Sequence, residues 1–248
     1  MSGHSKWSKI KRGKAVTDHK RSKVWARITR DIMVASRDGG GDPGMNAKLA
    51  LCVEKAKGAN MPKDNITRAI KRGTGEIQGA DYEELSYEGY APHGIAVFVE
   101  ALTDNTNRTV ADLRAMFAKA GGQLGTSGSV AFLFDRKSMF EIPSQDLDEM
   151  ELFEVVVDAG AEDLSNEDGH FTVTAPVEAF GSVTAALEGA DLTADEAGLQ
   201  RIPNMTKSLP VDDGRKVAAL LEKIEEHQDV QAVYSTLEFD DELVAALS

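Results

Sequence analysis

Hydrophobic and polar positions follow a helical period over the first part of the chain. The apolar residues on one helical face are Val24, Trp25, Ile28, Ile32 and Ala35. They predict a helix that the glycine-rich segment 39–44 ends. A second helix is expected after Asn46, a favourable N-cap residue, and a third after Pro62, with Gly58 and Gly73 as their ends. Together these elements predict a small three-helix domain.

After a linker at 73–79 the pattern changes to one typical of mixed helices and strands. The expected elements are strands at 84–90 and 95–102 around a turn at 91–94, a helix that buries Val110, Leu113 and Phe117, a buried strand at 130–134, a helix after Pro210 and a strand at 230–234. We expect the last helix and strand to return to the sheet that begins at Glu84.

The intervening segment has the pattern of a self-contained βαββαβ unit. Its expected elements are strands at 139–142, 161–164, 171–174 and 198–202, with helices at 147–159 and 177–187. The predicted fold class is therefore α+β, with an N-terminal three-helix domain followed by two α/β sandwich-like domains, the last a ferredoxin-like βαββαβ insertion in the middle one. The expected domains are 1–75, a basic helical domain with a flexible N-terminal arm, then 80–135 plus 205–240, and 136–204.

Charge is distributed unevenly along the 248 residues. The whole chain has 28 Lys and Arg against 41 Asp and Glu, a formal net charge of -13 at pH 7 that argues against a nucleic-acid-binding protein. Residues 1–72, however, hold 18 basic and 6 acidic residues, a net +12, whereas residues 73–248 hold 10 and 35, a net -25. Such an asymmetry suggests a polyanion-binding module joined to acidic domains.

The basic region contains the candidate nucleic-acid contacts. In the arm, Trp7 stands among five cations, so that side chains for phosphate adjoin an aromatic plane that can stack on an unpaired base. The expected contacts are Lys6, Trp7, Lys9, Lys11, Arg12, Lys14, Lys20, Lys23, Arg27 and Arg30. The alternative is a solvated terminus that Trp7 anchors to the helices. We favour polyanion binding because the cationic pattern continues along the first helix.

Signals for catalysis are nearly absent. Common hydrolase, zinc and nucleotide motifs are missing, and the five histidines lack metal-ligand spacing. Glu88 and His93 could share a proton, but a strand leaving into a turn explains them better. The glycine-rich segment 121–128 fits a tight connection better than a phosphate loop. The single cysteine, Cys52, has the position of a core residue and excludes disulfides. We expect no enzyme, cofactor, metal site or small-molecule substrate.

Arg108 is a further candidate because a cation in the first turn of a helix opposes the helix dipole. It either pairs with Asp104 or Glu100 or offers a secondary contact to an anion, and we favour the internal pair.

The sequence also bears on the compartment. The N-terminus has no apolar core of a secretory signal, and no apolar run is long enough to span a bilayer. A mitochondrial presequence is harder to reject, but the basic residues continue into the predicted helices. We expect a cytoplasmic protein with no membrane partner.

Five ordered blocks resemble the YebC family, which includes the mitochondrial translational activators of cytochrome c oxidase. The blocks lie at 3–7, 39–43, 87–92, 101–109 and 128–132. The chain departs from the family pattern at Val24-Trp25, where members commonly have Ile-Phe, and in the arm at 8–13. The resemblance covers essentially the whole chain.

This resemblance implies a three-domain, cytoplasmic, non-enzymatic protein. Members are generally described as probable DNA-binding transcriptional regulators. A newer view is a ribosome-associated factor that binds RNA and relieves stalling at proline-rich stretches. The expected partners are therefore DNA or ribosomal RNA, with the ribosome or the transcription machinery, and we name transcription first.

Overall fold

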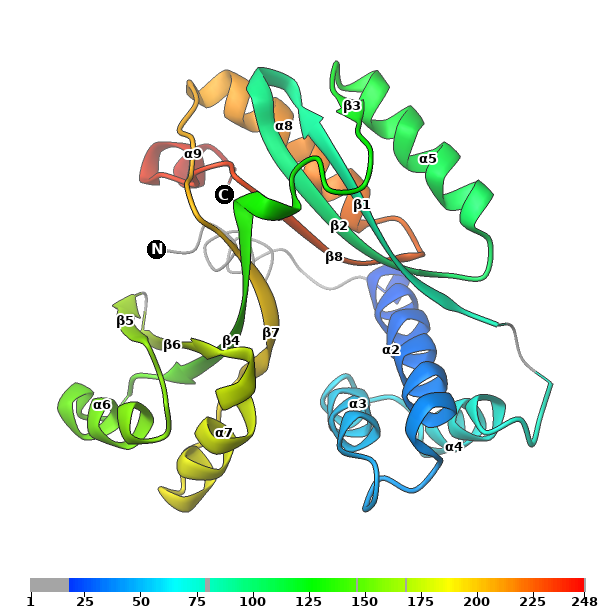
Figure 1. Ribbon diagram of the computed structural model, residues 1–248, viewed down its shortest axis with the longest axis vertical. Helices are drawn as coiled ribbons and strands as arrows, with labels where there is room; N and C mark the ends of the chain where they lie inside the picture. Colours follow the sequence, from blue (N-terminus) through cyan, green and yellow to red (C-terminus); the bar gives the residue numbers. More distant parts are fainter. Residues whose placement is uncertain (1–17, 79–80, 146, 168, 248) are drawn as a thin grey trace. The chain divides into compact units, whose positions relative to one another are not determined.

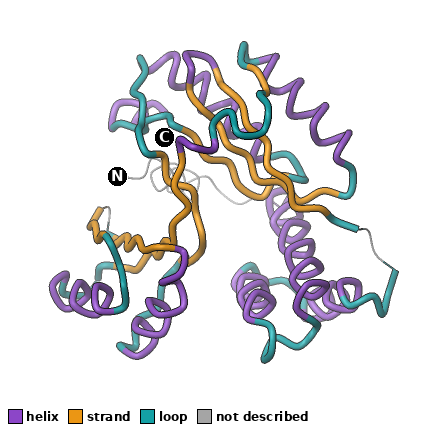
Figure 2. Tube along the Cα trace, viewed as in Figure 1, coloured by secondary structure: helices purple, strands orange, loops and turns teal. Residues whose placement is uncertain are grey.

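The computed structural model describes residues 18–78, 81–145, 147–167 and 169–247. The described chain is α+β, with N-terminal helices followed by two four-stranded sheets in which all paired strands are antiparallel (Figures 1 and 2). The predicted fold class is therefore confirmed. None of the described helices is long and apolar enough to cross a membrane.

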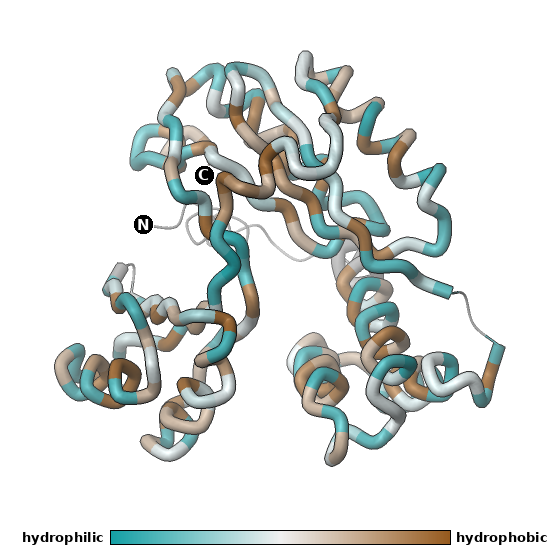
Figure 3. The backbone as a smooth tube through the Cα atoms, viewed as in Figure 1, coloured by the Kyte–Doolittle hydropathy of each residue, from teal (hydrophilic) through white to brown (hydrophobic). Residues whose placement is uncertain are grey.

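The three-helix domain consists of α2 (Asp18–Gly39), α3 (Ala47–Gly58) and α4 (Lys63–Gly73). The predicted cap is present, since Asn46 Oδ1 accepts a hydrogen bond from the Leu49 N–H at 3.0 Å. Hydrophobic and hydrophilic residues alternate along α2 and α5 (Figure 3), as expected of helices with one buried face. Ile32, Leu49 and Ala69 contribute to the core from α2, α3 and α4, respectively.

The expected core position of Val24 is wrong, because its side chain is 44% exposed. The neighbouring Trp25 packs against the core instead, and its indole N–H donates to the Ala59 carbonyl at 2.9 Å. The larger ring thus closes this end of the core and leaves Val24 at its edge.

The first sheet has the strand order β3-β1-β2-β8. Its strands are β1 (Glu83–Ala91), β2 (Ile95–Thr103), β3 (Gln123–Leu124) and β8 (Val230–Ser235). Helices α5 (Thr106–Lys119) and α8 (Val211–Glu225) pack on one face of it, since Val97, Phe117 and Leu221 belong to one core cluster. The last strand does return to this sheet, where β8 pairs with β2.

A C-terminal helix, α9 (Asp241–Leu247), adds to the expected elements. It packs on α8 at Gly214, where a Cβ atom would lie 2.9 Å from Leu243 Cδ1. The glycine therefore allows the close approach of the two helices.

The buried strand expected at 130–134 is wrong. Residues Ala131–Leu133 form a 3-10 turn, and strand β4 begins only at Phe134. The buried carboxylate of Glu88 accepts backbone N–H groups from Gly128, Val130 and Ala131 at 2.7, 2.6 and 2.8 Å. These N–H groups bind a side chain, so the segment curves around Glu88 instead of joining a strand ladder.

The second sheet has the order β5-β6-β4-β7, as expected of a ferredoxin-like βαββαβ unit. Its elements are β4 (Phe134–Pro143), α6 (Glu149–Asp158), β5 (Asp163–Glu167), β6 (His170–Pro176), α7 (Phe180–Gly189) and β7 (Glu196–Pro203). Leu152 and Val183 bring the two helices onto one face of the sheet, where the Phe140 and Phe180 rings stack at 5.1 Å.

The chain divides into two compact units. Residues 132–206 form one, and the described residues 18–131 and 207–247 form the other, which contains both the helical domain and the first sheet. The domain limits expected near residues 75, 136 and 204 stay predictions. Side chains of α2 account for the close association of the helical domain with the first sheet, as described next.

Candidate nucleic-acid interface

The expected contacts of the arm cannot be placed. Lys6, Trp7, Lys9, Lys11, Arg12 and Lys14 lie outside the described residues. Lys20 and Lys23 lie in the first turns of α2, where the structure describes the backbone alone. All eight stay predicted contacts.

Arg27 and Arg30 lie on α2, but both contact the acidic part of the chain. Arg27 Nη2 donates to the carbonyl of Glu225 at 3.1 Å. Arg30 Nη2 donates to the carbonyl of Gln228, and its Nη1 lies 4.0 Å from Asp229 Oδ1. Arg30 is only 8% exposed. These two arginines hold α2 against the connection between α8 and β8, so a direct phosphate contact by either would compete with these bonds.

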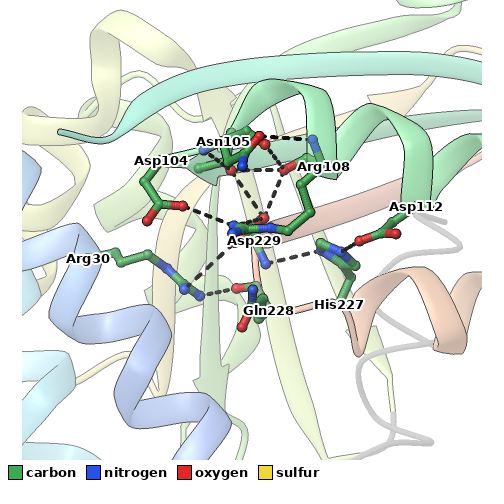
Figure 4. A network of polar contacts seen from close by, with 10 residues as sticks. Arg30, Asp104, Asn105, Arg108, Asp112, His227, Gln228 and Asp229 are labelled. Atoms are coloured by element: carbon green, nitrogen blue, oxygen red, sulfur yellow. Dashed lines mark hydrogen bonds and ion pairs between the residues drawn. The ribbon is translucent and has the colours of Figure 1, made fainter. Parts of the chain in front are cut away.

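Asp229 is the centre of the polar network that receives Arg30 (Figure 4). Its carboxylate is 1% exposed, and Oδ2 accepts from Thr103 Oγ1, Arg108 Nη2 and Thr109 Oγ1 at 3.1, 2.8 and 2.8 Å. Burial by itself would raise the pKa of Asp229, but the hydrogen bonds from Arg108, Thr109 and Thr103 outweigh it and lower the pKa. The carboxylate is thus kept charged and ties together α2, the end of β2, α5 and the start of β8.

The loop before β8 has a second anchor in the same network. The Asp229 N–H donates to Nδ1 of His227 at 3.2 Å, and Nε2 of that ring lies 3.1 Å from Asp112 Oδ2. Because Nδ1 of His227 accepts, the ring proton lies on Nε2, and this N–H donates to the Asp112 carboxylate on α5. The network was not predicted because an aspartate in a helix-to-strand connection has no distinctive local signal.

Arg108 has the internal pair that the sequence favoured. Its Nη2 lies 2.9 Å from Asp104 Oδ1 as well as 2.8 Å from Asp229 Oδ2. Hydrogen bonds to Asp229 and Asp104 raise the pKa of the guanidinium. Asn105 caps α5 by accepting the Arg108 N–H at 3.0 Å. A secondary anion contact at Arg108 stays a prediction, and an anion there would compete with two carboxylates.

The residues considered for catalysis have separate partners. Glu88 binds the N–H groups of its loop, His93 Nε2 lies 3.6 Å from Asp213 Oδ2, and Arg108 binds Asp229 and Asp104. Within the described ranges, no group of three or more His, Cys, Asp or Glu side chains is arranged to hold a metal ion.

Helices α3 and α4 present a set of cations that the sequence interpretation did not single out. Five basic side chains are exposed and form no hydrogen bond or close ion pair with any described residue, although the charge of Lys55 acts on the Asp31 carboxylate. They are Lys55, Lys63, Arg68, Lys71 and Arg72. For the four cations of α4 the signal was available in the sequence, because they avoid the apolar stripe that buries Ile66 and Ala69. We call these five side chains the basic face.

Comparisons with known proteins cover nearly the whole chain. A family model described as "TACO1/YebC protein N-terminal domain" matches residues 5–76, and one described as "TACO1/YebC second and third domain" matches residues 82–237. A relative from Salinibacter ruber is 50% identical over 97% of this chain and 94% of its own. One from Rubrobacter xylanophilus is 48% identical over 100% of both. Each is named "Probable transcriptional regulatory protein".

A solved structure shows the same fold. The crystal structure of a conserved hypothetical protein from Aquifex aeolicus matches with a TM-score of 0.81 and 41% identity, over 89% of this chain and 91% of that protein.

Proposed function

Because this chain belongs to the TACO1/YebC family, we propose that it is a nucleic-acid-binding regulator of gene expression, and in the first place a DNA-binding regulator of transcription. The names of its relatives support the regulatory role. The proposed role requires binding and no turnover.

The observation that carries the proposal is the basic face. Its five exposed cations lie in a region of net charge +12, whereas the remaining 176 residues have a net charge of -25. Lys and Arg side chains without a carboxylate partner can take phosphates and release the counterions condensed on the nucleic acid. The acidic remainder is repelled by the same polyanion, so the helical domain is the part that approaches it.

Arg27 and Arg30 have an indirect part in this proposal. By binding Glu225, Gln228 and the Asp229 carboxylate, they orient α2 and so the helices that present the basic face. The predicted arm contacts Lys6, Trp7, Lys9, Lys11, Arg12 and Lys14, with Lys20 and Lys23, would extend the surface beyond α3 and α4.

A second candidate function is a ribosome-associated translation factor that binds RNA and relieves stalling at proline-rich stretches. Trp7 among its cations favours it, because an aromatic ring stacks on the unpaired bases that RNA loops expose. Both candidates use the same basic region, and they differ in the nucleic acid that it meets.

Crosslinking in cells, followed by sequencing of the nucleic acid attached to the purified protein, distinguishes the two. Enrichment of promoter DNA would support transcriptional regulation, and enrichment of ribosomal RNA would support the translation factor. Recovery of neither above the level of an unrelated acidic protein would overturn the proposal as a whole.

A further inference from the structure

A cleft lies in the helical domain beside the basic face. It consists of two adjoining hollows of about 520 and 290 Å³, both lined by Met33, Arg72, Gln78 and Tyr82. The walls come from α2, the last turn of α4 and the segment that leads into β1. Each hollow is near or within the range of about 300 to 1,000 Å³ that is usual for small-molecule sites.

Among the described residues that line this cleft, three are arginines and one, Asp81, is a carboxylate. Arg72 belongs to the basic face. Arg37 donates to the Tyr82 carbonyl at 2.8 Å and to Asp38, and its side chain remains 46% exposed. Arg30 is 8% exposed, and its Nε has no hydrogen-bond partner among the described residues. Arg30 and Arg37 also face the carboxylates of Asp229 and Asp38, so Arg72 is the lining arginine that no described carboxylate pairs with. Its guanidinium and the exposed part of Arg37 offer donors that suit an anionic ligand.

The cleft also contains an aromatic surface. Tyr82 is partly buried and packs against the helical core, and the guanidinium carbon of Arg30 lies 6.0 Å from the centre of its ring. A guanidinium within about 6 Å of a ring centre is attracted to the face of that ring. A phosphate ion alone would contact only the arginines. A nucleotide could contact the Tyr82 ring and the Gln78 amide as well.

We propose that this cleft accepts one nucleotide of a single strand, with its phosphate on Arg72 and Arg37 and its base against Tyr82. The inference rests on the proposed function and adds to it a contact that only a strand with an unpaired base can make, because a base within a duplex cannot present its face to a side chain. Gln78 offers both a donor and an acceptor to the base edge.

The test measures the affinity of the full-length chain for a fluorescently labelled single-stranded RNA of about 12 nucleotides, a length within the usual range of single-strand sites. Arg72→Glu is compared with Arg68→Glu, which makes the same charge change on the same helix outside the cleft. Tyr82→Leu is compared with Tyr82→Phe, which keeps the ring. Unlabelled uridine monophosphate serves as competitor and shows whether a free nucleotide also enters the cleft.

We expect Arg68→Glu to weaken binding about threefold, as for one lost phosphate contact, and Arg72→Glu to weaken it at least tenfold. Tyr82→Leu should weaken it about tenfold and Tyr82→Phe less than twofold. If uridine monophosphate competes with the RNA for wild type but not for Arg72→Glu, the cleft also accepts free nucleotides. If the monophosphate does not compete, the cleft accepts a nucleotide only as part of a strand.

Equal losses of RNA affinity in Arg72→Glu and Arg68→Glu would overturn the proposal that the cleft binds a nucleotide. The proposal that the chain binds nucleic acid would stand. Full binding by a folded Tyr82→Leu variant would overturn the proposed contact between the base and Tyr82. If Tyr82→Leu does not fold, as judged by circular dichroism, the comparison of Arg72→Glu with Arg68→Glu still decides the proposal. A wild-type chain that binds neither single-stranded RNA nor duplex DNA would instead refute the proposed function.

Discussion

Nη1 of Arg30 lies 4.0 Å from Oδ1 of Asp229, so a cation of the first helix is held by the acidic part of the chain. The same carboxylate binds Arg108, Thr103 and Thr109 through its other oxygen. The basic and acidic parts of the sequence are therefore not kept apart in the fold, since cations of the basic part bind groups of the acidic part. Part of the positive charge joins the helical domain to the first sheet, and a further part lies on the basic face.

Asp229→Asn should lower the free energy of unfolding by about 2 kcal/mol. The amide keeps the shape of the side chain but removes the charge that Arg108 and Arg30 face, and it presents two donors to hydroxyls and guanidinium groups. Urea unfolding monitored by circular dichroism measures the change. The matched control is Asp104→Asn, which breaks the 38%-exposed partner of Arg108 and should cost less than about 1 kcal/mol. Equal effects of the two substitutions would contradict the central role of Asp229.

The stability lost in Asp229→Asn should itself depend on pH. Because the folded state lowers the pKa of Asp229, the unfolded chain binds its proton more readily. The carboxylate's contribution is then complete above the unfolded value of roughly 4 and disappears as the pH falls through the lower folded value. Urea midpoints of wild type and variant should therefore converge on acidification below about pH 4. A constant difference across that window would show that the charge of Asp229 is not what stabilises the fold.

Glu88→Gln should loosen the loop at residues 128–131. A carboxylate accepts all three backbone N–H groups that face it, whereas the amide nitrogen can accept none of them. We expect a loss of about 1 to 3 kcal/mol and faster hydrogen exchange at Gly128, Val130 and Ala131. The control is Glu84→Gln, an exposed partner of Lys48 that should change stability by less than about 1 kcal/mol. Unchanged exchange in Glu88→Gln would refute the anchoring role.

Cys52 should be unreactive in the folded protein. Burial, helped by the nearby Asp31 carboxylate, raises the pKa of the thiol to about 11. The reactive thiolate is then scarce at neutral pH, and the side chain is only 9% exposed. A disulfide reagent such as dithionitrobenzoate should label Cys52 slowly in buffer and rapidly in urea. Equally fast labelling in both conditions would mean that this core opens readily.

The elements were predictable wherever their signals are local. The cap at Asn46 and the turn at 91–94 depend on neighbours in sequence, as do the apolar stripes of the first three helices. The structure confirms them, apart from the position of Val24. The buried strand expected at 130–134 fails for the opposite reason. An apolar run indicates burial, but the N–H groups of Val130 and Ala131 are bound by Glu88, which lies some forty residues earlier.

The candidate site was harder to predict than the fold. Periodicity correctly places Arg27 and Arg30 on a polar face of α2, but it does not say what lies against that face. In the structure the acidic connection before β8 lies there, and it takes up both arginines. The cations of α3 and α4 differ from these arginines in that they stay exposed. The sequence does not mark them as strongly as the arm, because they are spread along two helices.

The salt dependence of nucleic-acid affinity tests the central claim most directly, namely that unpaired cations of the helical domain bind a polyanion. If the full-length chain neutralises about six to ten phosphates, the logarithm of its association constant for duplex DNA should fall with the logarithm of salt concentration at a slope of about -5 to -9. For a single strand the slope per contact is slightly shallower. An affinity that stays flat as salt rises would contradict the account.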